Sequence, residues 1–291
     1  GPEIKKGLVS ARGAPENKNR IGGAWERSGK IVSMTGDGVN DAPALKKADI
    51  GVAMGITGTE VSKDAAAMIL SDDNFATIIK AVLNGRNVYR NIKNAILFLL
   101  SGNMAGIISV LYTSIMGLPV PFAPVHLLFI NLLTDSLPAI AIGMEPSDKA
   151  LLNEPPRDSS EGILTGNLIW KIMGQGALIA AATMTAFYIG LQTDAAVAST
   201  MAFATLTLAR LFHGFNCRGK KNIFRLGFKS NPYSLAAFAS GTLLLAIVIF
   251  VPFMHGLFSV ADITTTAVWQ IIGLAVLPTV VIQILKTLRK N

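Results

Sequence analysis

Residues 35–43 read TGDGVNDAP and directly follow a short apolar run at residues 30–34. Glycines let a backbone approach a bound group closely, and the N–H groups at the start of a helix favour an anion. Asp37 and Asp41 offer the hard oxygen ligands that Mg²⁺ prefers, and Asn40 can orient either carboxylate or donate to a phosphoryl oxygen. A surface turn is the alternative, but α/β proteins place ligands at the end of a strand. The stretch therefore predicts a magnesium and phosphate site.

The segments around this run predict a small α/β head. Apolar runs alternate with short helical patterns, which is typical of a parallel sheet covered by helices on both faces. We expect strands at residues 30–34, 50–54 and 67–70, and helices near residues 42–47 and 59–66. From about residue 74 a helical pattern continues without proline into a long apolar stretch. This pattern predicts one continuous stalk helix, with two abutting helices as the alternative.

Six apolar stretches approach the roughly 20 residues that a helix needs to cross a bilayer. They cover about residues 94–116, 122–143, 168–190, 197–215, 233–254 and 267–286. Hydrophobic residues make up 51% of the chain and charged residues only 15%, against about 25% charged residues in soluble domains. The sequence therefore predicts an integral, multi-pass membrane protein with six transmembrane helices behind a soluble head.

Basic residues indicate how these helices are oriented. Lys and Arg lie in the loops after the second and fourth stretches and in the C-terminal tail, and the three opposite loops contain neither. Such a bias marks the cytoplasmic side, so we expect the head and the C-terminus in the cytoplasm. It also accounts for the net charge of +8, which could otherwise suggest nucleic acid. We expect membrane lipid, and no nucleic acid, as a partner.

Polar residues interrupt the second stretch, where residues 131–138 read NLLTDSLP. Asn131, Thr134 and Asp135 are spaced i, i+3 and i+4, which places them on one face of a helix. Pro138 can loosen the helix and free backbone carbonyls. Amide, hydroxyl and carboxylate oxygens suit a hard cation such as Ca²⁺, which takes about 6–8 oxygen ligands. Hydrogen bonding between helices is the alternative, but an ionisable residue in a membrane is costly and usually functional.

Two of these stretches resemble one known family. Residues 35–49 resemble the hinge signature of P-type ATPases, whose phosphorylation domain is similar to the haloacid dehalogenase fold. Residues 131–139 resemble the sixth transmembrane helix of type II pumps, most closely the sarco/endoplasmic reticulum calcium pumps and their bacterial relatives. The resemblance implies an α/β haloacid-dehalogenase-like domain fragment followed by an all-α six-helix transmembrane bundle. It also implies ATP-driven calcium transport through an aspartyl-phosphate intermediate, in a bacterial plasma membrane.

The resemblance also implies the domain boundaries. Residues 1–74 resemble the C-terminal part of the phosphorylation domain, residues 75–93 a cytoplasmic stalk, and residues 94–291 transmembrane helices five to ten. The sequence contains no aspartate followed by Lys-Thr-Gly-Thr, the site that these pumps phosphorylate. We therefore expect the phosphorylated residue, the nucleotide domain and the first four membrane helices in a missing N-terminal portion of the same pump.

The same resemblance assigns roles within the first motif. It implies that Asp37 coordinates the catalytic Mg²⁺ and that Asn40 and Asp41 hold the phosphoryl site together. Thr35 and Gly36 are expected to contact the bound cofactor, ATP. The motif is thus expected to serve both the metal and the phosphate of one reaction.

A basic residue upstream is a further candidate. Residues 11–18 read ARGAPENK and resemble the segment that supplies a phosphate-contacting lysine to these pumps. By that resemblance, Lys18 stabilises charge on the transferred phosphoryl group. An ordinary solvated lysine is the alternative.

Residues 101–103 read SGN and resemble the fifth transmembrane helix of the same pumps. The resemblance implies that Asn103 joins Asn131, Thr134 and Asp135 as a calcium ligand. Other cations stay open, because oxygen ligands do not strictly separate calcium from manganese, sodium or protons. An inactive membrane fragment is a further alternative. A secondary transporter predicts inverted repeats and leaves the first motif unexplained.

Two departures from the family pattern bear on the number of transported ions. The two-calcium pumps carry glutamates where this chain has Gly106 and Arg210. We therefore expect one transported calcium, with Arg210 filling the vacant site as a built-in positive charge and pairing with Asp135. An arginine that snorkels near a helix end is the alternative. His213, about one turn further on, is expected at the membrane interface.

Overall fold

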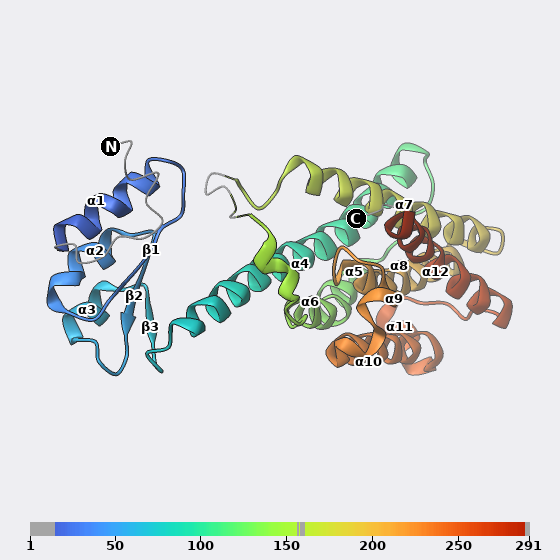
Figure 1. The fold of residues 1–291 in the computed structure, drawn as a ribbon. Coiled ribbons are helices and arrows are strands. Elements are labelled where there is room, and N and C mark those ends of the chain that lie inside the picture. The colour runs from blue at the N-terminus through green and yellow to red at the C-terminus, as the bar shows by residue number, and fades with distance from the viewer. Residues whose placement is uncertain (1–14, 156, 158–160, 289–291) are drawn as a thin grey trace. The chain divides into compact units, whose positions relative to one another are not determined.

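The computed structural model describes residues 15–155, 157 and 161–288, and side chains from residue 20 onward. The chain divides into two compact units. The head unit is Gly1–Arg86 with Lys149–Asp158, and the bundle unit is Asn87–Asp148 with Ser159–Asn291. Figure 1 shows short helices and strands in the first unit and long helices in the second. Helix α4 contributes residues to both units.

A three-stranded parallel sheet, in the order β1-β2-β3, forms the centre of the head unit. Thr35 lies beside Val52, and Val52 lies beside Met68 on the next strand. The expected alternation of parallel strands and short helices is confirmed. The elements are α1 (Pro15–Glu26), β1 (Ser33–Gly36), η2 (Val39–Asp41), α2 (Ala42–Lys47), β2 (Ile50–Met54), α3 (Glu60–Ala65) and β3 (Met68–Leu70).

The expected start of the first strand, at residue 30, was wrong. The strand β1 begins at Ser33 because its partner β2 begins at Ile50, directly opposite. Just before this point the Asp49 carboxylate accepts the N–H of Val32 at 2.8 Å. A side chain thus takes the place of a backbone partner, and the ladder starts later than the apolar run.

Helix α4 (Phe75–Ile115) is a single helix of 41 residues, about 60 Å long at 1.5 Å per residue. The prediction of one continuous helix is confirmed, and the alternative of two abutting helices was wrong. In the head unit, Arg86 on α4 donates to the carbonyl oxygens of Leu151 at 2.6 Å and Glu154 at 2.5 Å. A cation therefore satisfies carbonyls at the end of the 3₁₀ turn η4 (Lys149–Asn153).

The described residues contain six helical segments long and apolar enough to cross a membrane, as predicted. The most enclosed is α8, where 72% of the apolar window is buried; it contacts α7, α10 and α12. The segments are Phe75–Ile115 (α4), Pro124–Gly143, Gly166–Leu191 (α7), Ala195–Cys217 (α8), Pro232–Phe250 (α10) and Thr265–Leu288 (α12). Short helices α9 (Ile223–Leu226) and α11 (Pro252–Phe258) lie in the connections.

The fifth segment is shorter than the apolar pattern suggested. Helix α10 ends at Phe250, and Pro252 starts the separate helix α11. A residue that precedes proline is pushed out of the helical region, and Val251 has the extended angles φ −92° and ψ 112°. The predicted end at residue 254 was therefore wrong.

The second segment changes helix type along its length. It consists of α5 (Pro124–Phe129), the π-helical turn η3 (Ile130–Thr134) and α6 (Ser136–Gly143). In the turn, the N–H of Asp135 donates to the carbonyl of Ile130, five residues back, at 2.9 Å. The helix is thus irregular at residues 130–134, whereas Pro138 itself lies within the regular helix α6. Wide turns of this kind are frequent at functional sites.

Candidate functional site

In the head unit, the Asp41 carboxylate organises the loop that follows β1. Its Oδ2 accepts the backbone N–H groups of Asp37 at 3.2 Å and of Gly38 at 3.3 Å. Gly36 makes room for this arrangement, because a Cβ at that position would lie 2.4 Å from the Cβ of Asp41. One carboxylate is therefore used to shape the loop, and the close approach requires glycine.

The side chains of Asp37 and Asn40 are exposed on the same loop, and Thr35 is half-buried in β1. The carbonyl of Asp37 accepts the N–H of Thr59 at 2.8 Å and the hydroxyl of Ser62 at 3.1 Å. The backbone of Asp37 is thus fixed while its carboxylate stays accessible. Among the described residues, no group of three or more His, Cys, Asp or Glu side chains could hold a metal ion.

This donor set fits Mg²⁺ in one particular way. Magnesium is usually held by one or two carboxylates, with water and substrate phosphate as its other ligands. The exposed carboxylate of Asp37 meets that requirement. Lys18 belongs to α1, but its side chain lies outside the described residues.

A buried ion pair forms the centre of the polar group in the bundle unit. Arg210 on α8 donates from Nη2 to Oδ2 of Asp135, just beyond η3, and to Oδ1 of Asn103 on α4 at 3.0 Å. The Arg210 side chain is 3% exposed and that of Asp135 is 2% exposed. Oδ1 of Asp135 is buried and has no hydrogen-bond partner among the described residues. The expected pairing is observed, and Arg210 does not snorkel.

A glycine on α4 leaves room for the Arg210 guanidinium in its present position. A Cβ at Gly102 would lie 2.4 Å from Nε and 2.6 Å from Cζ of Arg210. The guanidinium therefore packs directly on the backbone of α4. In contrast, a Cβ at Gly106 would meet nothing within 4 Å.

The other two candidates in the second segment are placed differently from one another. Thr134 is buried, and its hydroxyl donates to the carbonyl of Ile130 at 3.0 Å. Asn131 is exposed in this chain. Because the π-helical turn changes the angle between successive side chains, spacing in an ideal α-helix does not describe this face. The structure brings Asp135, Asn103 and Arg210 together.

Residues 119–288 match the family described as "Cation transporting ATPase, C-terminus". The chain belongs to this family of cation-transporting ATPases. It is 44% identical over 274 residues to a calcium-transporting ATPase of Bacillus subtilis, covering 93% of this chain and 31% of that protein. It is 45% identical over 285 residues to a calcium-transporting ATPase of Listeria monocytogenes, covering 97% and 32%.

A human relative, calcium-transporting ATPase type 2C member 1, is 35% identical over 291 residues, covering 99% of this chain and 32% of the relative. The chain therefore spans about a third of the length of the curated relatives it matches.

Sequence reasoning missed a second polar group in this ATPase chain, and its expectation for His213 was wrong. The His213 ring is 1% exposed, at 2.9 Å from Oγ of Ser101 and 3.3 Å from Sγ of Cys217. It also stacks on Phe98, at 6.3 Å between ring centroids. The position of a single histidine in a sequence does not distinguish a side chain at the membrane interface from a buried, hydrogen-bonded one.

Two asparagines on α4 contact the backbone at the ends of α6 and α8 in the bundle unit. Asn91 donates from Nδ2 to the carbonyls of Gly143 at 3.1 Å and Glu145 at 2.9 Å. Asn94 donates to the carbonyl of Arg218 at 3.3 Å. These contacts connect residues 91–94 of α4 with the chain at the ends of α6 and α8. No sequence motif predicted them.

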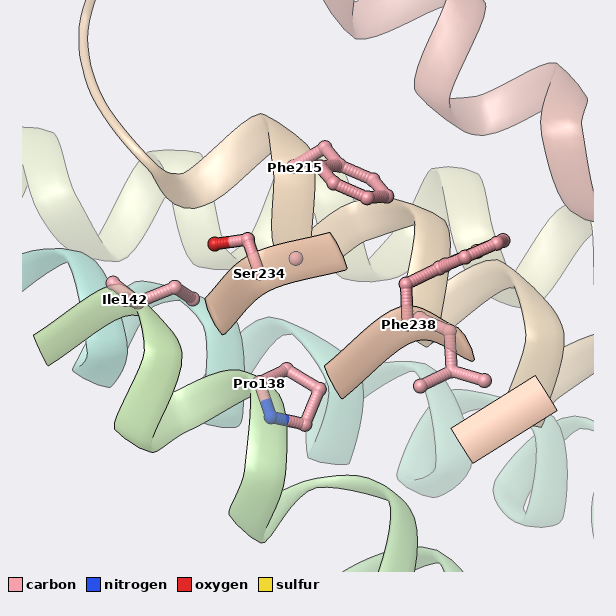
Figure 2. Close-up of a pocket in the computed structure, with 7 residues that line it drawn as sticks. Pro138, Ile142, Phe215, Ser234 and Phe238 are labelled. Carbon is pink, nitrogen blue, oxygen red and sulfur yellow. The ribbon is translucent and has the colours of Figure 1, made fainter. Parts of the chain in front are cut away.

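A small pocket lies between α6, α8 and α10 in the bundle (Figure 2). Figure 2 shows Pro138 and Ile142 on α6, Phe215 on α8, and Ser234 and Phe238 on α10 around it. Its cavity volume of about 10 Å³ is space for about one water molecule. The pocket is therefore too small for an organic substrate.

Proposed function

We propose that this chain is the C-terminal part of an ATP-driven calcium pump. The observation that carries the proposal is the buried Asp135 carboxylate on a candidate membrane segment, with one oxygen left without a partner among the described residues. A buried, unsatisfied acceptor is costly, and in a membrane such a residue usually serves ion transport. Family membership supports the class of protein, and the names of the relatives support calcium.

In the proposed pump, the head unit supplies part of the phosphoryl-transfer site. Residues 1–74 form the C-terminal part of a haloacid-dehalogenase-like phosphorylation domain, and residues 75–93 form the stalk. Asp37 holds Mg²⁺, which neutralises charge on the phosphoryl oxygens when bound. Asp41 shapes the loop, and Asn40 lies beside it as a donor to phosphate.

The remaining assignments in the head concern the nucleotide. Thr35 and Gly36 border the ATP phosphates, and Lys18 offsets charge on the transferred group. ATP hydrolysis through an aspartyl-phosphate then requires an aspartate from the N-terminal portion of the same pump, because this chain contributes a metal ligand and hydrogen-bond donors but not the nucleophile.

In the bundle, residues 94–291 correspond to transmembrane helices five to ten. Asp135, through its free Oδ1, Asn131 and Thr134 supply oxygen ligands to one transported Ca²⁺, and Asn103 joins them when Arg210 releases its Oδ1. The charge on Arg210 takes the place of a second ion, because the guanidinium already occupies one oxygen of Asp135 and the oxygen of Asn103. The proposed stoichiometry is therefore one calcium for each ATP.

The proposed orientation places the head, the basic loops and the C-terminus in the cytoplasm. It follows from the distribution of Lys and Arg among the loops. A bacterial plasma membrane is the proposed location, since the bacterial relatives cover almost the whole chain at 44–45% identity. Membrane lipid surrounds the bundle.

The full-length protein in sealed vesicles tests this function. ATP-dependent uptake of ⁴⁵Ca²⁺, with calcium-stimulated release of phosphate, is the expected result. Asp37→Asn should abolish both, and Asp135→Asn should abolish calcium stimulation. Stimulation by Mn²⁺, Na⁺ or protons instead of Ca²⁺ would identify another cargo. Wild-type uptake by both variants, or absence of any cation-stimulated hydrolysis, would overturn the proposal.

A further inference from the structure

Asp73 in the head unit occupies a ring of hydrogen-bond donors. Its Oδ1 accepts the N–H groups of Gly55 at 2.7 Å and Ile56 at 3.0 Å. Its Oδ2 accepts the N–H and the hydroxyl of Thr57, both at 2.8 Å. Successive backbone N–H groups of this kind form an anion-binding concavity. Here the anion is a side chain of the same chain, from a residue 16–18 positions away.

The loop that Asp73 holds leads directly to Asp37. Residues 55–58 connect β2 to α3, and the next residue, Thr59, caps α3 by accepting the N–H of Ser62 at 3.3 Å. Thr59 and Ser62 are the two residues that donate to the Asp37 carbonyl, at 2.8 and 3.1 Å. Hydrogen bonds thus tie the start of the segment 55–62 to Asp73 and its later part to the backbone of Asp37, and the chain itself connects the two.

We propose that Asp73 is a positioning residue for Asp37. By holding residues 55–57, it fixes the two donors that set the Asp37 carbonyl, and so fixes the direction in which the exposed Asp37 carboxylate meets Mg²⁺. This inference rests on the proposed function, in which Asp37 binds the metal. Loss of Asp73 weakens metal binding at Asp37 without removing the metal ligand itself.

Asp73 lies in the short turn that connects the sheet to α4. The strand β3 ends at Leu70, and α4 begins at Phe75, two residues after Asp73. Asp73 has a left-handed backbone, with φ 48°, a conformation that aspartate tolerates better than most non-glycine residues. Four hydrogen bonds to its side chain hold the residue in this turn.

The adjacent Asp72 provides a matched control. Its carboxylate accepts the N–H of Asn74 at 3.1 Å and the hydroxyl of Thr77 at 2.7 Å. It therefore caps the start of α4, and the interactions described for it do not involve the loop at residues 55–58. Asp72→Asn removes the same charge, one residue away, from the same turn.

The experiment measures phosphorylation of the full-length protein by ³²P-labelled inorganic phosphate as Mg²⁺ is varied, for wild type, Asp73→Asn and Asp72→Asn. Asp73→Asn should raise the half-saturating Mg²⁺ concentration about tenfold, comparable to the loss of one charge-assisted hydrogen bond. Maximal labelling should be kept, and Asp72→Asn should match wild type. A purely structural role predicts a lower melting temperature with an unchanged Mg²⁺ requirement.

A second variant keeps the test decisive if Asp73→Asn does not fold. Thr57→Val removes only the hydroxyl contact to Asp73 and keeps the three backbone contacts. It should raise the Mg²⁺ requirement in the same direction by a smaller factor, about two- to threefold. An unchanged requirement in the folded variants overturns the inference. A wild-type protein that inorganic phosphate never labels overturns the proposed function instead, and the inference with it.

Discussion

Arg218 and Glu145 are joined by two parallel hydrogen bonds, from Nε to Oε2 and from Nη2 to Oε1, each 2.9 Å long. The Arg218 side chain is fully buried, and that of Glu145 is 5% exposed. Asn231, which caps α10, donates to Glu145 at 2.8 Å, and Ser230 accepts from Arg218 at 2.6 Å. The pair therefore joins the ends of α6 and α8 to the start of α10.

Breaking this pair on one side should destabilise the bundle strongly. Arg218→Met leaves a buried carboxylate without its cation, a loss of about 3–5 kcal/mol, whereas Glu145→Met combined with Arg218→Met should recover most of it. Thermal unfolding of the purified full-length protein in detergent measures the effect. Lys221→Met is the control, because its pair with Asp148 is exposed and contributes only about 0–1 kcal/mol.

Removing the positive charge at position 210 should change how the pump handles its ion. In Arg210→Met, Asp135 and Asn103 lose their shared donor, so both oxygens become available to Ca²⁺. Calcium affinity should rise at least about tenfold, as expected when a charged hydrogen bond no longer competes. The pH dependence of transport should change as well. Equilibrium ⁴⁵Ca²⁺ binding and uptake at several pH values measure both, and unchanged values contradict a role for Arg210.

Adding a single methyl group at Gly102 should displace the arginine. The added carbon of Gly102→Ala overlaps the guanidinium of Arg210, and overpacking of this kind costs about 1–3 kcal/mol. Combining Gly102→Ala with Arg210→Met should restore much of the stability. Gly106→Ala is the control on the same helix, because its new Cβ meets nothing within 4 Å. Equal melting temperatures for the two single variants would contradict this packing.

Acid should loosen the loop that Asp73 holds. The hydrogen bonds from Ile56, Thr57 and Gly55 lower the pKa of Asp73 from 3.8 to about 2. Because the folded-state pKa is depressed, its contribution is complete above about pH 4 and is lost as the pH falls through 2. Hydrogen-exchange protection of the Ile56 and Thr57 amides should fall over that range. In Asp73→Asn, protection should be low throughout; an unchanged profile contradicts the assignment.

Much of the fold follows from patterns that the sequence displays locally. The six membrane segments and the parallel strands were predictable, because few structures can bury a long apolar run or an alternation of short strands and helices. The continuity of α4 followed from the absence of proline. The pairing of Arg210 with Asp135 was one of two expected outcomes, and burial decided between them.

Other features depend on contacts between distant residues. Asp73 reaches partners that precede it by 16–18 positions, and Arg218 reaches a partner 73 positions away. A lone aspartate in a turn, or a lone arginine after a helix, gives no signal of such a partner. The π-helical turn before Asp135 changes the hydrogen-bond pattern of the helix, which residue types do not reveal. The i, i+3, i+4 spacing therefore did not predict that Asn131 is exposed.

The packing of Arg210 on the bare backbone at Gly102 constrains how these two positions could change. A side chain at residue 102 would overlap the present position of the Arg210 guanidinium, so the arginine would have to shift. Once the arginine is in place, any larger residue at 102 is penalised. A smaller residue at 210 would release position 102 from this constraint, so we expect substitutions at the two positions to be coupled.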